Sequence, residues 1–251
     1  MRLDDGAVIP RYFVVAEATH ELQNPTSKEK LLLLAKRLGL GPDSHVLDIA
    51  SGRGGPALIL AEASGCAVRG VEIAPEFQAV AVERAAAAGL ADRLSFELGD
   101  GASATFEREA YDAALCLGAS FVFGSLADTV EALAPAVRPG GYVVVGEPYW
   151  RRLPLPDDYE ARNDPWTTLE GTVVVFETSG LTVSSVIASS EDDWDRYETL
   201  HWQAVEEWLA AHADDPDASD IRSRHEHSKR SYLRYEREYL GWAIFVGWKR
   251  P

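Results

Sequence analysis

The chain has 251 residues, of which 46% are hydrophobic, and its formal net charge at pH 7 is −16. This length and apolar content suit one large domain, or one domain with a cap, around an ample core. The negative charge argues against binding nucleic acid or anionic lipid through a general electrostatic field. We therefore expect a neutral or cationic small molecule as the partner.

The chain shows no sign of export or of membrane insertion. The first five residues carry mixed charge and no apolar segment follows them, so we expect no signal peptide. The longest aliphatic run, Leu31 to Ala35, is far too short to span a membrane. The two cysteines, Cys66 and Cys116, fall in predicted strands and are expected to be buried and reduced, which favours the cytoplasm.

The first part of the chain is expected to be irregular up to residue 26. Thr26-Ser27-Lys28-Glu29 is typical of a capping box, and the helix that it begins should end near Gly39. From residue 45 strands and helices alternate, which predicts an α/β, doubly wound and mostly parallel sheet with helices on both faces. The strands are expected at 45–49, 66–73, 94–98, 112–117 and 142–147, and the helices at 55–64, 75–88 and 125–136.

The second part of the chain is richer in large aromatics, because all seven tryptophans lie from Trp150 onward. Residues 151–166 contain three prolines and no clear period, which predicts a loop or lid. Residues 169–180 are ambiguous: their valines favour a strand, but a doubly wound order requires a helix, which we expect. A strand at 181–188, a long helix capped by Ser190, a helix at 232–240 and a strand at 241–248 should follow.

The most informative segment is Val46 to Leu58, where a predicted strand runs into the turn Gly52-Arg53-Gly54 and then into a helix. The two glycines let the backbone turn sharply and approach a ligand closely. The free N–H groups of the helix start suit a ligand rich in acceptors. At the end of the second strand, Glu72 can accept both hydroxyls of a ribose.

Two cofactors are compatible with this turn. The spacing Gly52-x-Gly54-x-x-Ala57 also matches a dinucleotide fingerprint, so a nicotinamide-dependent oxidoreductase stays an alternative. Asp48 disfavours that alternative, because an anion at the strand end would repel a pyrophosphate. The same carboxylate would tolerate the cationic methionine end of S-adenosylmethionine.

Asp48-x-x-x-Gly52-x-Gly54 resembles the first motif of the class I S-adenosylmethionine-dependent methyltransferases. Gly99-Asp100-Gly101-Ala102 and Arg138-Pro139-Gly140-Gly141 resemble later motifs of that family. Gly146-Glu147-Pro148-Tyr149-Trp150 and Trp194-Asp195-Arg196-Tyr197-Glu198 extend the likeness to a bacterial group within it. The resemblance implies a Rossmann-like sheet of seven strands whose last strand is antiparallel, S-adenosylmethionine as cofactor, and methyl transfer to a small soluble acceptor. A regulatory protein that binds S-adenosylmethionine or another nucleotide without methyl transfer stays an alternative.

The expected cofactor site lies at successive strand ends, and the resemblance implies that Asp100 binds the adenine amino group. The predicted cofactor-binding residues are Asp48, Ala50, Ser51, Gly52, Gly54, Glu72, Ile73, Asp100, Gly101, Ala102 and Leu117. We expect a single domain over 1–251, made of an N-terminal leader and helix (1–44), the cofactor-binding core (45–149), a cap and substrate region (150–240) and the last strand (241–251).

Glu147 is the main catalytic candidate, because a carboxylate at the end of an apolar strand is costly unless it is paired or used. Tyr149 and Trp150 could form an aromatic wall for a flat or cationic acceptor. In related methyltransferases the N-terminal segment folds over the cofactor, so His20 is a second catalytic candidate and Asn24 a candidate for acceptor binding. The pair His225-x-His227 hints at a metal, but a solvated helix face is the preferred interpretation and no metal is expected.

Overall fold

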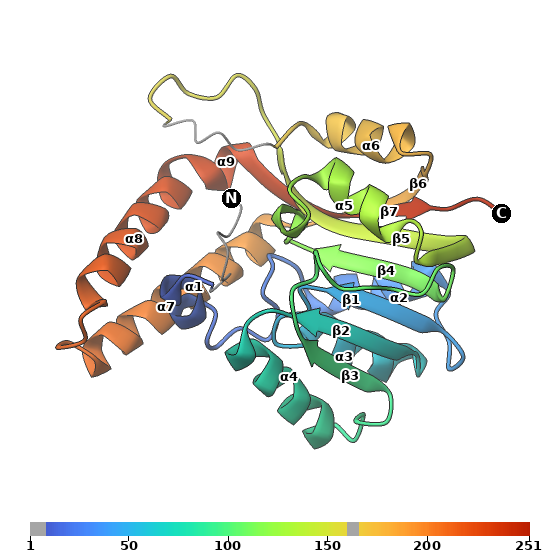
Figure 1. Ribbon diagram of the computed structural model, residues 1–251. Coiled ribbons are helices and arrows are strands. Elements are labelled where there is room, and N and C mark those ends of the chain that lie inside the picture. Colours follow the sequence, from blue (N-terminus) through green and yellow to red (C-terminus); the bar gives the residue numbers. More distant parts are fainter. Residues whose placement is uncertain (1–8, 160–165) are drawn as a thin grey trace.

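The computed structural model describes residues 9–159 and 166–251. A seven-stranded sheet of order β3-β2-β1-β4-β5-β7-β6 forms its centre (Figure 1). Strands β1 to β5 run parallel, as the alternation of elements predicted. Strand β7 pairs antiparallel with both β5 and β6, as the resemblance implied for the last strand. The strands are β1 (His45–Ile49), β2 (Ala67–Glu72), β3 (Leu94–Leu98), β4 (Tyr111–Leu117), β5 (Val137–Trp150), β6 (Thr182–Ala188) and β7 (Leu240–Trp248).

Helices cover both faces of the sheet. Buried side chains of α2, α3 and α4 form one core with the strands, and those of α5 and α6 form a second core on the opposite face. Both cysteines are free and buried in these cores, as expected. The helices are α1 (Arg11–Ala16), α2 (Lys28–Leu38), α3 (Gly55–Ser64), α4 (Pro75–Ala87), α5 (Leu126–Leu133), α6 (Leu169–Thr178), α7 (Glu191–Ala211), α8 (Ala218–Ser231) and α9 (Arg237–Tyr239), with a 3₁₀ turn η1 (Ser120–Val122) and a π-helical turn η2 (Tyr232–Glu236).

The ambiguous segment at 169–180 is the helix α6, as the doubly wound order required. Thr168 caps it by accepting the N–H of Gly171, and it buries Thr172 and Phe176. The strand propensity of its valines is a weaker influence than this capping and burial. Ser190 caps α7 in a capping box with Asp193, which also agrees with the sequence pattern.

Three expectations for the helical parts were wrong. Residues 11–16, expected to be irregular, form α1, whose Val15 and Ala16 pack in one cluster with Val205 of α7. The helix expected at 232–240 is a π-helical turn followed by the short α9, and β7 already begins at residue 240. His225, expected on a solvated face, is buried because α8 packs against α7.

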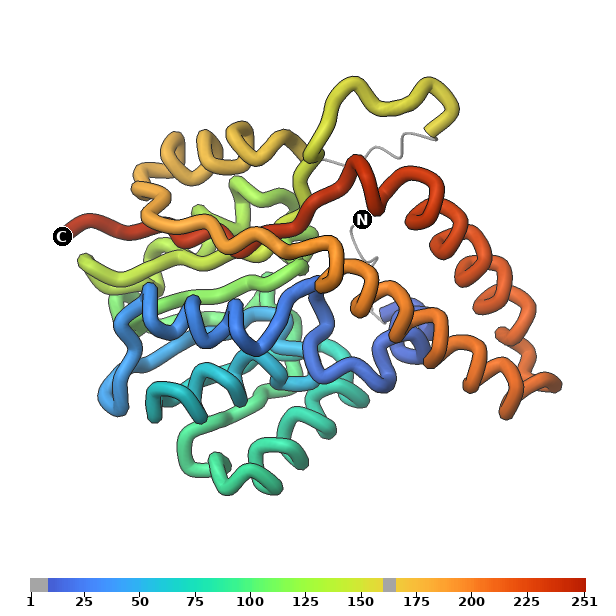
Figure 2. The backbone as a smooth tube through the Cα atoms, turned by 180° about the vertical axis from the view of Figure 1, so that it is seen from behind, coloured from blue at the N-terminus to red at the C-terminus, as the bar shows by residue number. Residues whose placement is uncertain are grey.

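The helices α7 and α8 extend beyond the sheet, with α1 beside α7 (Figures 1 and 2). The predicted lid at 151–166 is only partly described. Residues 151–159 form bends and one turn, and residues 160–165 lie outside the described residues. Among the helices in the described ranges, none has both the length and the apolar content to cross a membrane.

Candidate functional site

The parallel strands β1, β2, β4 and β5 end at the same edge of the sheet, and a cavity of about 920 Å³ opens there. Its wall is built from these strand ends, from the N-terminal residues 9–24 and from the segment that follows β4. Open α/β sheets place their ligands at this edge, in the crevice outside the carboxyl ends of the strands. The fold therefore brings together residues that are far apart in the sequence.

The turn after β1 has an unusual backbone. Ala50 and Gly52 both have a φ of 55°, in the left-handed region. Glycine adopts this conformation readily, but for Ala50 it costs energy, and such strained residues cluster at functional sites. Gly54 also has a positive φ, but it does not line the cavity: a Cβ there would lie 2.9 Å from the ring of Phe96. Gly54 thus serves close packing between the turn and the sheet.

Glu72 joins two strand ends. Its side chain is buried in the cavity wall, where Oε2 accepts the N–H of Gly52 and Oε1 accepts the N–H of Ala74, both at 2.8 Å. Burial raises the pKa of Glu72, and the backbone donors oppose that rise. The carboxylate is therefore held rigidly, with the remaining lone pairs of its oxygens available to a ligand.

Asp48 and Ser51 offer unpartnered polar atoms at the same place. Both residues are buried and line the cavity, and neither Asp48 Oδ2 nor Ser51 Oγ has a hydrogen-bond partner. Burial and the nearby Glu72 carboxylate raise the pKa of Asp48 to about 7. Buried polar atoms without partners are rare in folded proteins, so these atoms fit a site that a polar ligand completes.

Residues 20–25, which we call the strap, cross the strand ends. Gln23 Oε1 accepts the N–H of Arg53 at 2.6 Å, and Asn24 Nδ2 donates to the carbonyl of Leu117 at 3.0 Å. Arg53 Nε donates to the carbonyl of His20 at 3.1 Å. The strap is thereby anchored both to the glycine turn and to the end of β4.

Glu147 lies near the end of β5 and is 6% exposed. Its Oε1 accepts a hydrogen bond from the hydroxyl of Ser120 at 3.0 Å. Burial raises the pKa of Glu147 to about 7, and the bond from Ser120 only partly opposes this effect. A carboxyl group with such a pKa can take up a proton at neutral pH, as a general base must.

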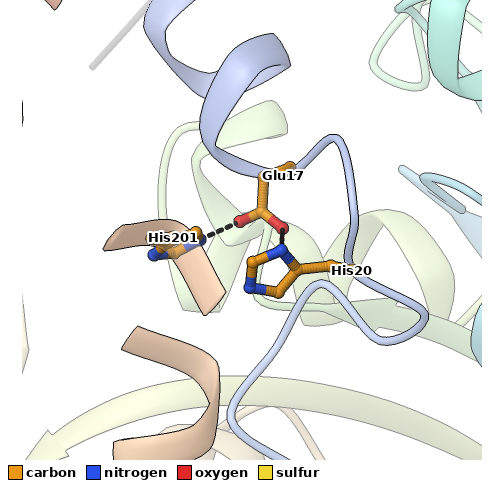
Figure 3. A group of neighbouring side chains, drawn as sticks. All are labelled: Glu17, His20 and His201. Carbon is orange, nitrogen blue, oxygen red and sulfur yellow. Dashed lines mark hydrogen bonds and ion pairs between the residues drawn. The ribbon is translucent and has the colours of Figure 1, made fainter. Parts of the chain in front are cut away.

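Beside the strap, Glu17 and His20 meet the helix α7 (Figure 3). His201 Nε2 lies 2.8 Å from Glu17 Oε1, and the hydroxyl of Tyr197 donates to the same oxygen at 2.8 Å. Burial alone would lower the pKa of His201, but the nearby carboxylates of Glu17 and Glu198 raise it to about 9. These contacts hold the N-terminal segment against α7.

The structure gathers most of the predicted site residues at this cavity. Glu147 and Asn24 line it, but His20, Tyr149 and Trp150 are not among the lining residues. Tyr149 lies against Gly241, and Trp150 packs against Trp166. All predicted cofactor-binding residues except Gly54 line the cavity: Asp48, Ala50, Ser51, Gly52, Glu72, Ile73, Asp100, Gly101, Ala102 and Leu117.

Sequence reasoning missed several lining residues, which come from the N-terminal segment, from η1 and from α7. They include Phe13, Glu17, Gln23, Ser120, Phe121 and Tyr197. The local sequence carries no helical signal for Phe13, because residues 12–16 form a continuous apolar run without helical spacing. No local signal existed for Glu17 and Tyr197, which are 180 positions apart and meet only in the fold.

Comparisons with known proteins point to one family. A family model described as "Methyltransferase domain" matches residues 46–141. The chain is 33% identical over 243 residues to the Escherichia coli protein YjhP, which is described as uncharacterised, and the match covers 95% of this chain and 98% of YjhP.

Two solved structures are similar over almost their full length. An S-adenosylmethionine-dependent methyltransferase from Geobacter sulfurreducens, in complex with S-adenosylhomocysteine, has a TM-score of 0.90 and 35% identity, and the match covers 99% of this chain and all of that one. A second one, from Thiobacillus denitrificans and with the same ligand, has a TM-score of 0.90 and 33% identity over 96% of this chain and 99% of that one.

Proposed function

The chain belongs to the class I S-adenosylmethionine-dependent methyltransferases, and from this premise we propose that it methylates a small molecule bound beside Glu147. S-adenosylmethionine is the cofactor, and its sulfonium supplies an activated methyl group. What the protein adds is orientation of the two reactants, exclusion of water and a group that takes the acceptor's proton.

The cofactor would be held by the strand ends. We expect the ribose hydroxyls to bind Glu72, whose carboxylate is already fixed by two backbone N–H groups. Asp100 is expected to bind the adenine amino group, as the resemblance to the family implies. The unpartnered atoms of Asp48 and Ser51 support a polar ligand at the β1 turn, directly or through water.

The remaining part of the cavity supports a neutral or cationic acceptor with an apolar body. Rings of Phe13, Phe121, Trp166 and Tyr197 contribute to its lining, together with the carboxyl group of Glu147. Aromatic faces attract cations as well as apolar groups. A carboxylate in this surrounding favours an ammonium or hydroxyl donor and disfavours an anionic acceptor.

Glu147 is proposed as the base. An ammonium or hydroxyl group cannot attack a methyl group until it loses its proton, and Glu147 would accept that proton. Nitrogen or oxygen then forms a bond to the methyl carbon as the bond from carbon to sulfur breaks, which leaves S-adenosylhomocysteine. The single observation that carries this proposal is the buried carboxyl of Glu147, whose pKa is about 7 and which faces the cavity.

The experiment is a screen for release of S-adenosylhomocysteine over amines, phenols, thiols and carboxylates, with binding of S-adenosylmethionine measured in parallel. We expect turnover with apolar amines or phenols and little or none with carboxylates. A protein that binds the cofactor but turns over no acceptor would fit the regulatory alternative. Turnover confined to carboxylates would contradict the proposed acceptor class.

A further inference from the structure

Glu17, His20 and His201 form a compact group next to the cavity. Glu17 follows α1 directly, His20 begins the strap, and His201 lies on α7 (Figure 3). Glu17 and His201 are 184 positions apart, so no sequence motif could reveal the group. One ligand atom from each of the three residues lies within 4.8 Å of the others.

Each carboxylate oxygen of Glu17 faces a different imidazole ring (Figure 3). Glu17 Oε1 lies 2.8 Å from His201 Nε2, and Glu17 Oε2 lies 3.8 Å from His20 Nδ1. The two rings are close to one another, with their centroids 4.5 Å apart. Two nitrogen donors and one carboxylate therefore converge from two different segments of the chain.

Two of these atoms lack a partner. Glu17 Oε2 and His20 Nδ1 are both buried and neither makes a hydrogen bond. The other nitrogen of His20, Nε2, lies 3.0 Å from the carbonyl oxygen of Tyr197, which can only accept, so the proton is on Nε2. Nδ1 then presents a lone pair to the carboxylate. Two buried acceptors that face each other are unfavourable unless a cation or a donor lies between them.

The second nitrogen of each histidine faces an oxygen acceptor, and for His20 this contact is a hydrogen bond. His20 donates to the backbone carbonyl of Tyr197, and His201 Nδ1 faces Glu198 Oε2 at 3.9 Å. Histidines that bind metal ions characteristically donate their second nitrogen to a carbonyl or a carboxylate, which sets the tautomer and the ring orientation. The hydroxyl of Tyr197 further orients Glu17 through its bond to Oε1.

We propose that Glu17, His20 and His201 bind one divalent transition-metal ion of the zinc or iron(II) class. The ion would replace the proton that His201 Nε2 shares with Glu17 Oε1, and this proton would be released to solvent. Two imidazoles and one carboxylate suit these ions, whereas calcium and magnesium prefer oxygen ligands alone. A three-residue set leaves at least one coordination position for water or another ligand. Because Glu17 also lines the cavity, the ion would lie at its wall and tie the start of the strap to α7.

The test uses the full chain. The protein is dialysed against zinc and then against metal-free buffer, and its bound zinc is measured by mass spectrometry. We expect one equivalent of zinc, and with cobalt(II) in its place an absorption spectrum typical of nitrogen and oxygen ligands. His20→Ala should weaken zinc binding at least about tenfold. His227→Ala, which removes an exposed histidine of α8, should not change it.

If the wild-type protein retains no zinc, the proposal is wrong. His201 would then serve only as a protonated partner of Glu17. Zinc binding that His20→Ala leaves unchanged, in a variant whose circular dichroism shows that it is folded, would overturn it as well. Affinity for S-adenosylmethionine is measured on the same samples. Zinc content tests the metal site, and methyl transfer tests the proposed function. A variant that loses one and keeps the other therefore shows which proposal fails.

Discussion

Glu72 connects the ends of two strands, and we also expect it to bind the ribose. Its carboxylate binds the N–H groups of Gly52 and Ala74, so the same side chain shapes the glycine turn and faces the cavity. Hydrogen bonds to a charged group contribute about 1.5–3 kcal/mol each. We therefore expect substitution of Glu72 to weaken cofactor binding.

Glu72→Gln should lower the affinity for S-adenosylmethionine at least about tenfold, which corresponds to about 1.4 kcal/mol. The reason is that the amide turns one acceptor into a donor and removes the charge. Calorimetry on the folded variant measures this. Glu97→Gln is the control, because Glu97 is exposed on β3 and pairs with Arg69 away from the cavity. Equal affinity of Glu72→Gln and wild type would remove Glu72 from the ribose site.

At the scale of residues, the sequence predicted most residues at the strand ends that line the cavity, but it did not predict the aromatic residues that line it. Asp48, Glu72 and Asp100 each lie at or just after the carboxyl end of a predicted strand, and the carboxyl ends of parallel strands must meet at one edge. Tyr149 and Trp150 lie in an equally suggestive place in the sequence, but the long strand β5 carries them past the cavity into the core. Which face a side chain takes at the end of a strand depends on packing that lies outside the local sequence.

At the scale of elements, the strap and the strand ends fit each other through glycines. Gly118 follows β4 with a φ of 77°, and a Cβ there would lie 1.9 Å from Asn24 Oδ1. A Cβ at Gly52 would lie 2.1 Å from Gln23 Oε1. A side chain at either glycine would displace the amide group of Asn24 or Gln23, and with it a hydrogen bond that anchors the strap. Packing between distant elements also explains why the sequence did not predict α1. This helix has six residues and no capping side chain, so it depends on its contacts with α7.

Gly118→Ala should weaken binding of S-adenosylmethionine about tenfold, because the new methyl group displaces Asn24 and the strap. Gly89→Ala is the matched control: its φ of 68° gives a similar backbone strain, but nothing lies within 4 Å of the added Cβ. Both variants should lose stability by about 1–2 kcal/mol from the left-handed conformation. If both lose stability alike and neither loses affinity, the strap does not shape the cofactor site.

At the scale of the whole molecule, the strand ends of the sheet, the N-terminal segment and α7 together enclose the cavity in which we expect the cofactor. Glu17, Gln23 and Asn24 line the cavity from one side, and Tyr197 of α7 lies with them. A reactive sulfonium benefits from a site that excludes water. The resemblance to the family predicted that the N-terminal segment lies near this cavity, whereas the position of Tyr197 depends on contacts between distant segments.

Hydrogen exchange with and without S-adenosylhomocysteine measures whether the segments around the cavity cover the bound ligand. We expect the ligand to slow exchange in residues 17–25 and 118–125 more than in residues 151–159, which do not line the cavity. The central strands should change little because they are already protected in the free protein. Protection confined to residues 46–58 would mean that the cofactor binds without engaging residues 17–25 or 118–125.

The most direct test of the proposed methyl transfer is its dependence on pH with an acceptor found by the screen. Burial raises the pKa of Glu147 to about 7, and the base must be ionised, so kcat/KM should rise as the pH increases through about 7. In Glu147→Gln this rise should vanish and turnover should fall about a hundredfold or more, with cofactor affinity unchanged. A folded Glu147→Gln variant that keeps full activity and the same pH profile would contradict the role of Glu147 as the base.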